Sequence, residues 1–152
     1  MPTPTPRTAL AVVLTSLLLS LLPASSAQAQ AQDKFQHQAR VVTNNVRDNH
    51  DVASLEKTKC VQKFARRQAR KMARQERLYH QDLGVVLNRC NLSGVGENVA
   101  YGYSTGRAAV KAWMKSPGHR ANLLNPGYRQ LGMAVRHSKD GTPYAVQVFG
   151  RK

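Results

Sequence analysis

Residues 109–135 read AVKAWMKSPGHRANLLNPGYRQLGMAV, and the order of structural signals in this stretch decides the fold. Residues 106–115 (GRAAVKAWMK) gather their larger apolar side chains on one helical face, which predicts an amphipathic helix. Ser116 and Pro117 then suit the N-cap and first position of a second, short helix that ends near Leu124. The stretch therefore begins with two consecutive helices.

A turn and two strands follow these helices. Asn-Pro-Gly at residues 125–127 is a turn signal, and residues 130–136 (QLGMAVR) and 143–149 (PYAVQVF) are both rich in strand-forming residues. The polar loop between them, HSKDGT, is consistent with an antiparallel hairpin. The sequence thus predicts that a β-hairpin closes the chain.

The residues before this stretch are mainly helical in pattern. Apolar positions predict a helix over residues 33–50, capped by Asp33, and a longer one over residues 59–80. Residues 81–93 are expected to be irregular, and residues 94–103 form a glycine- and tyrosine-rich turn. Helices first and an antiparallel pair last predict an α+β domain.

One face of the 59–80 helix is strongly basic. It is either an ordinary solvated face or a surface for anionic polymers, and its apolar side is too rich in alanine for membrane insertion. The opposite face carries Glu76 one turn before His80, an arrangement that suits either a surface pair or a polar cavity. The residues of the candidate anionic-surface patch are Lys63, Arg66, Arg67, Arg70, Arg74 and Arg77.

The first 29 residues have the pattern of a cleaved secretory signal. A positive start at Arg7 precedes an apolar run over residues 9–22, and small residues ending Ala27-Gln28-Ala29 supply a cleavage site. The apolar run is shorter than the ~20 residues that span a bilayer. We therefore expect a signal peptide over residues 1–29 and one secreted, unanchored domain over residues 30–152.

Charge and cysteine content agree with secretion. Only Arg7 of the formal net charge of +15 lies in the signal, so the mature chain stays strongly basic and favours anionic partners. Cys60 and Cys90 are the two cysteines, and an even pair in a secreted chain predicts one disulfide bond.

Residues 94–100, GVGENVA, contain one of only three glutamates, with no basic residue within seven positions of it. The imidazoles of His80 and His119 could join this residue, Glu97, in an open zinc site, although their separation in sequence does not itself indicate one. A two-carboxylate glycosidase would need Glu76 or Asp82 as the partner of Glu97. The chain contains no P-loop and no HExxH motif.

Taken together, several motifs resemble the bacterial branch of the CAP superfamily, the SCP domain. This superfamily includes cysteine-rich secretory proteins, antigen 5 proteins and plant pathogenesis-related proteins. The resemblance extends over about residues 35–150. Its motifs are GENVAYG at 96–102, the 109–135 stretch, YAVQVFG at 144–150, TNNVR at 43–47, CVQKFARRQARKMA at 60–73 and Tyr79-His80.

The resemblance implies an α-β-α sandwich with a small antiparallel sheet between helical layers. It also implies a cleft lined by two histidines and two acids, of which His80, Glu97 and His119 match three. Ser116 stands where the second family acid usually lies, so we consider Glu76 as a substitute source of charge. Within this frame, Gly94 and Gly96 are expected to adopt positive φ and turn Glu97 inward.

Three functions follow as expectations. The first is a binding module whose His80–Glu97–His119 cleft holds zinc or another divalent cation and an unidentified ligand, which by resemblance could be a lipid or sterol. The second is an envelope or peptide hydrolase with Glu97 as its acid or base. The third is a cationic adhesive protein for anionic cell-envelope polymers. We expect a monomer, and no specific nucleic-acid partner.

Overall fold

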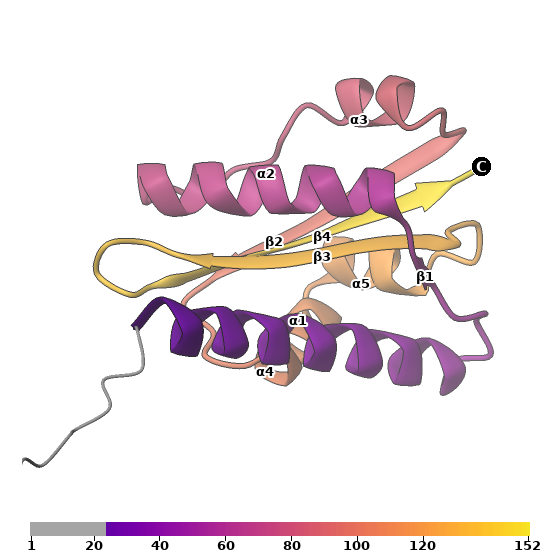
Figure 1. The fold of residues 1–152 in the computed structure, drawn as a ribbon. Helices are drawn as coiled ribbons and strands as arrows, with labels where there is room; N and C mark the ends of the chain where they lie inside the picture. The colour runs from indigo at the N-terminus through magenta and orange to yellow at the C-terminus, as the bar shows by residue number, and fades with distance from the viewer. Residues whose placement is uncertain (1–23) are drawn as a thin grey trace, which may run out of the picture.

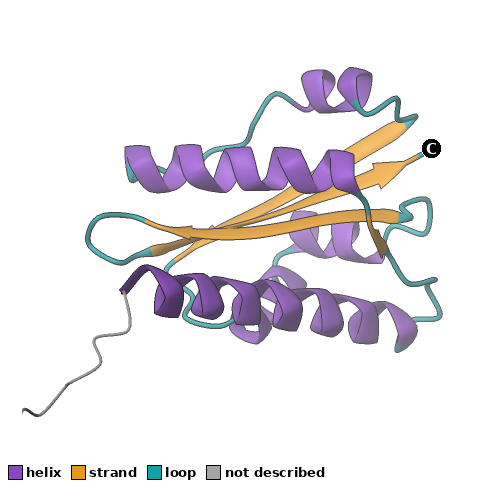
Figure 2. Cartoon of the chain, in the orientation of Figure 1, coloured by secondary structure: helices purple, strands orange, loops and turns teal. Residues whose placement is uncertain are grey.

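The computed structural model describes residues 24–152, and in it a four-stranded sheet lies between two layers of helices. Figure 1 shows α2 and α3 on one face of the sheet and α1, α4 and α5 on the other, and Figure 2 shows the same layers by element type. The predicted α+β sandwich is confirmed. The elements are α1 (Ala24–Asp48), β1 (Glu56–Lys57), α2 (Lys59–Gln75), α3 (Leu83–Arg89), β2 (Gly94–Tyr101), α4 (Gly106–Lys115), α5 (Pro117–Leu124), β3 (Gln130–His137) and β4 (Pro143–Arg151).

The strands lie in the order β1-β3-β4-β2. The predicted hairpin of β3 and β4 forms the centre of the sheet, β2 pairs antiparallel with β4, and the two-residue β1 pairs parallel with β3. The long strand β2 is therefore an edge strand, with one side free of strand partners.

Both faces of the sheet are buried, because alternate residues of β4 enter different cores. Tyr144, Val146 and Val148 pack in the core beneath α2 and α3. Ala145 and Phe149 pack in the core shared with α1, α4 and α5. Successive side chains of a strand point to opposite faces, so one apolar strand fills two cores.

The amphipathic helix predicted at residues 59–80 is shorter than expected. Helix α2 ends at Gln75, because Glu76 takes a left-handed conformation (φ 49°, ψ 36°) and its N–H bonds the carbonyl of Met72. The prediction that Glu76 and His80 share a helix face is therefore wrong.

Three other boundaries also differ from the sequence prediction. Residues 81–93 contain helix α3, which is capped by the Asp82 side chain through Val85 N–H at 3.2 Å. Residues 94–101 form strand β2 rather than a turn. Helix α1 begins before Asp33, at Ala24, so Asp33 does not cap it.

The predicted signal peptide falls largely outside the described residues. Residues 1–23 are not described, and residues 24–29 form the start of α1, so the cleavage position stays a prediction. Among the helices of residues 24–152, none combines the length and apolar character needed to cross a membrane.

The predicted disulfide between Cys60 and Cys90 is confirmed. It joins the first turn of α2 to the residue that follows α3, with the two Cα atoms 5.7 Å apart. The bond closes a segment that includes residues 79–81.

Replacing both cysteines with serine should lower the free energy of unfolding by about 3–4 kcal/mol, because the cross-link restricts a loop with a sequence separation of 30. Urea denaturation of the double variant and the oxidised wild type measures the difference. Unfolding free energies that agree within about 0.5 kcal/mol would contradict the entropic role assigned to the bond.

Candidate functional site

The edge strand β2 presents two functional side chains to opposite faces of the sheet. Val95 and Val99 pack in the core beneath α2, and Glu97 shares their side of the strand by alternation. Asn98 points to the other face, where its amide reaches α5. Residues from both helical layers therefore meet at this edge.

The Glu97 carboxylate is buried and fully engaged. Its Oε1 accepts hydrogen bonds from His80 Nδ1 at 2.9 Å and from the backbone N–H of Gln81 at 3.1 Å, and its Oε2 accepts from Gln81 Nε2. Its side chain has 0% exposure. Burial raises the pKa of Glu97, while the bonds from Gln81 and His80 oppose that increase.

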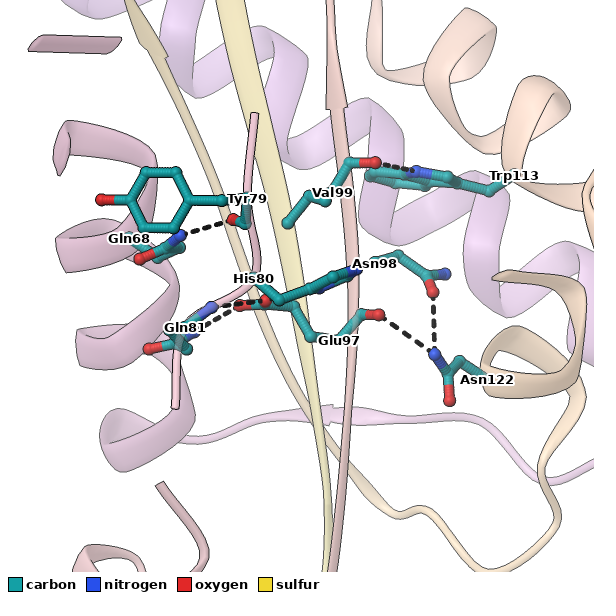
Figure 3. Close-up of polar contacts among 9 residues, drawn as sticks. All are labelled: Gln68, Tyr79, His80, Gln81, Glu97, Asn98, Val99, Trp113 and Asn122. Carbon is teal, nitrogen blue, oxygen red and sulfur yellow. Dashed lines mark hydrogen bonds and ion pairs between the residues drawn. The ribbon is translucent and has the colours of Figure 1, made fainter. Parts of the chain in front are cut away.

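The backbone that carries His80 is anchored to helix α2. The buried Gln68 side chain donates from Nε2 to the carbonyl of Tyr79 at 2.7 Å, and the Arg77 guanidinium lies 4.7 Å from the centre of the Tyr79 ring. Figure 3 shows Gln68, Tyr79, His80 and Gln81 together on one side of β2. These contacts hold the His80 ring against Glu97 although helix α2 has already ended.

The bond to Glu97 also fixes which His80 nitrogen is available. When Nδ1–H donates to the carboxylate, the neutral ring carries its free lone pair on Nε2. The His80 side chain is 57% exposed, in contrast to the fully buried carboxylate beneath it. The arrangement therefore presents an oriented imidazole to solvent.

His119 approaches from the opposite layer, on α5. Its backbone carbonyl accepts from Asn98 Nδ2 at 3.1 Å. Asn122 Nδ2 donates to the Asn98 side-chain oxygen at 3.0 Å and to the Glu97 carbonyl at 3.1 Å, as Figure 3 shows. Burial lowers the pKa of His119, and the nearby charge of His80 lowers it further.

Two side chains satisfy backbone carbonyls of β2 that have no strand partner. Asn122 bonds the carbonyl of Glu97, and Trp113 Nε1 of α4 donates to the carbonyl of Val99 at 3.1 Å. These contacts lock α4 and α5 against the edge and close it to further strand pairing.

Gly96 allows this close approach, but not through positive φ. A Cβ at Gly96 would lie 2.7 Å from both Asn122 Oδ1 and the Tyr128 hydroxyl oxygen. The glycines with positive φ in the described chain are Gly102 and Gly141, so the expectation for Gly94 and Gly96 is wrong. The glycine is needed for space between β2 and α5.

A hollow of about 270 Å³ opens beside His119. Its rim includes the exposed side chains of Leu78, Tyr101 and Tyr103, and Ser116 lies within it. The position that matches the family's second acid therefore lies in this hollow beside His119, but it carries a hydroxyl. Exposed aromatic side chains next to an imidazole provide apolar contact together with a polar group.

The three predicted metal ligands come together only in part. His80 contacts Glu97, and the charge of His80 acts on His119, but both Glu97 oxygens are used inside the protein. Residues 24–152 contain no group of three or more His, Cys, Asp or Glu residues arranged to hold a metal ion. Glu97 therefore orients His80 and does not fit as a direct ligand.

The other acids proposed from sequence do not join Glu97. Glu76 is exposed at the end of α2, and the Asp82 side chain caps α3. The pKa of Glu97 is raised by burial, and no neighbouring carboxylate contributes to this shift. Among residues 24–152, Glu97 thus has no carboxylate partner of the glycosidase type.

A further local pattern, GYSTG at residues 102–106, matches the G-x-S-x-G spacing of nucleophile elbows. An elbow serine occupies a strained turn after a buried strand. Here the exposed Ser104 follows an antiparallel edge strand and is not among the described residues with positive φ. The glycine spacing alone therefore does not create a nucleophile.

Sequence reasoning missed the amides that build the site: Gln68, Gln81, Asn98 and Asn122. Gln68 had a detectable signal, because it lies on the apolar side of α2 with Ala65 and Met72, where a polar residue needs a partner. The remaining amides had no comparable signal, since their partners are distant in sequence.

Comparisons with known proteins agree with this architecture. The profile of the cysteine-rich secretory protein family, CAP, matches residues 42–149. The Bacillus subtilis (strain 168) protein YkwD is 31% identical over 117 residues, which cover 72% of this chain and 45% of YkwD. The chain thus spans less than half the length of this curated relative.

Two solved structures are similar in fold. An extracellular SCP-domain protein from Bacillus anthracis has a TM-score of 0.73 and 29% identity, over 87% of this chain and 44% of its own. A cysteine-rich secretory protein from Staphylococcus aureus has a TM-score of 0.67 and 21% identity, over 80% of this chain and 40% of its own.

The free energy of unfolding of the Glu97→Gln variant, relative to that of the wild type, should increase progressively as pH rises from 4 to 8. The raised pKa means that the folded state prefers the neutral carboxyl, so ionisation at higher pH lowers wild-type stability, whereas glutamine stays neutral. Urea denaturation at several pH values, with chelator present, measures the difference. A difference that is constant across this range would contradict the burial effect.

Proposed function

Because the chain belongs to the cysteine-rich secretory protein (CAP) family, we propose that it is an extracellular binding domain whose ligand occupies the cleft between His80 and His119. The extracellular assignment is supported by the SCP-domain relative from Bacillus anthracis, which is itself an extracellular protein. The binding role rests on the chain's own residues.

The observation that carries the proposal is the engagement of Glu97. Its carboxylate accepts three hydrogen bonds from His80 and Gln81, and its side chain has no exposed surface. Such a group fixes the tautomer and the orientation of an imidazole. We assign Glu97 as a positioning residue.

The same geometry favours binding over hydrolysis. A general acid or base must come within hydrogen-bond reach of the reacting group. Glu97 would have to break its bonds to His80 and Gln81 and become exposed before meeting a substrate. For this reason we place the hydrolase alternative second, with no observation in its favour.

A divalent metal such as zinc fits the pair of imidazoles but not the three-residue set predicted from sequence. His80 Nε2 and the His119 ring are neutral donors of the type that zinc accepts. Burial lowers the pKa of His119, which favours the neutral form of that ring. A bound metal would supply a Lewis-acidic attachment point for a ligand, with its other positions filled by ligand or water oxygen atoms.

The size of the adjoining hollow limits what the cleft can enclose. About 270 Å³ is below the roughly 300–1,000 Å³ typical of sites that bury a whole drug-sized ligand. The hollow suits a small molecule or one end of a longer one, such as a lipid, lying against Leu78 and the two rim tyrosines. A sterol would be held by one end rather than enclosed.

Zinc titration by calorimetry tests the metal part of the proposal. The His80→Ala, His119→Ala double variant should show no specific binding. Glu97→Gln should bind roughly 10–100-fold more weakly, because an uncharged side chain orients and polarises His80 less effectively. Glu76→Gln makes the same change at an exposed carboxylate outside the cleft and should match the wild type.

Undiminished zinc binding by the double-histidine variant would exclude this pair as the metal site. Thermal unfolding of each variant serves as the control for folding. The two histidine substitutions are expected to be tolerated because neither His80 nor His119 belongs to either hydrophobic core.

A further inference from the structure

A second hollow, of about 750 Å³, follows helix α2 and is lined almost entirely by cations. It lies apart from the cleft, because Lys57 belongs to β1 at one edge of the sheet and the cleft follows β2 at the other. The lining residues of this basic groove are Lys57, Lys59, Gln62, Lys63, Arg66, Arg67 and Arg70.

The basic groove and the anionic-surface patch predicted from the sequence share only some of their residues. Arg74 does not line the groove, and Arg77 lies beyond the end of α2, over the Tyr79 ring. Lys57 and Lys59 take their place at the other end of the helix. The cations thus gather around the N-terminal part of α2.

None of these cations forms an ion pair with an acidic side chain of residues 24–152. In the part of the chain that the structure describes, the one ion pair between a basic and an acidic side chain is His80–Glu97. Burial lowers the pKa of Arg136 of β3, the nearby charges of Arg70 and Arg66 lower it further, and the charge of Asp33 opposes the shift. Like charges held together without ion-pair partners among the described residues indicate a surface that binds an external anion.

The spacing of the cations suits a linear partner. Lys59, Lys63, Arg66 and Arg70 follow one another at three- and four-residue intervals, so they repeat on one helix face. A rise of 1.5 Å per residue separates the first from the last by roughly 16 Å along the axis. An elongated, repeatedly charged molecule can contact all four at once.

The lining also indicates which polyanion fits. Insertion into a membrane needs large apolar side chains, and the groove lining has none. Single-stranded nucleic acids stack their bases on aromatic side chains, and the lining has none of these either. Arginine guanidinium groups bind phosphate oxygens in a bidentate manner.

We propose that the basic groove binds a linear phosphodiester polymer without bases, of the polyol-phosphate type found on cell surfaces. The polymer lies along α2, with successive phosphates paired to the lysine and arginine side chains. This binding is independent of the cleft and would keep the domain on an anionic envelope while the cleft meets its own ligand.

Fluorescence anisotropy with a short, labelled poly(glycerol phosphate) chain tests the proposal. The affinity of the unmodified protein for this polymer should fall roughly tenfold or more between 50 and 200 mM salt, because several counterions are released on binding. The variant with Lys63, Arg66, Arg67 and Arg70 all changed to glutamine should bind at least about tenfold more weakly at constant salt.

A matched control distinguishes the effect of the groove cations from the effect of the protein's net charge. Changing Lys34, Arg107, Lys111 and Lys139 to glutamine removes the same number of exposed charges elsewhere. This control should bind within about threefold of the wild type, since only its long-range attraction is reduced. Thermal unfolding establishes that both variants are folded, and the His80→Ala, His119→Ala variant should bind the polymer normally.

Several results would overturn the proposal. Equal losses in the two quadruple variants would mean that net charge alone attracts the polymer. Tighter binding to oligothymidylate of equal phosphate number would assign the groove to nucleic acid, and tighter binding to phosphatidylglycerol vesicles would assign it to membranes. Tighter binding to polyglutamate of equal charge would exclude selection for phosphate.

Discussion

The carboxylate of Glu97 must be buried and must also be satisfied, and the layout of the cleft depends on this constraint. An ionised carboxylate without partners is costly in a protein interior. The three hydrogen bonds from His80 and Gln81 offset that cost, but only if residues 79–81 lie against β2. Gln68 and the Cys60–Cys90 disulfide hold that segment in place.

The free side of β2 is where the two halves of the site meet. An unpaired strand edge has backbone groups that need partners, and here Asn122 and Trp113 supply them. The same contacts bring α5 and His119 to the edge that His80 reaches from the other layer. Closing the sheet edge and assembling the cleft are thus achieved by one set of hydrogen bonds.

Two regions of the folded chain differ strongly in their electrostatic character and lie at opposite edges of the sheet. At the β2 edge, one buried acid orients an imidazole inside a largely satisfied network of amides. Around the N-terminal part of α2, near β1, cations gather without an ion-pair partner in residues 24–152. A strongly basic composition therefore does not act uniformly over the surface, because folding concentrates part of the charge in one groove.

The sequence by itself determined the class of fold, the terminal hairpin, the helices around the Ser116-Pro117 junction and the cysteine pair. These features depend on local periodicity, turn residues and composition, which act over a few neighbouring positions. Only the tertiary structure decided that α2 ends at Gln75, that GVGENVA is an edge strand, and which donors satisfy the buried carboxylate of Glu97. Those outcomes depend on hydrogen bonds between residues such as Gln81 and Glu97, or Asn98 and His119, which are far apart in the chain. Local pattern does not encode such partners, because a buried polar group is satisfied by whichever donor the packed layers bring to it.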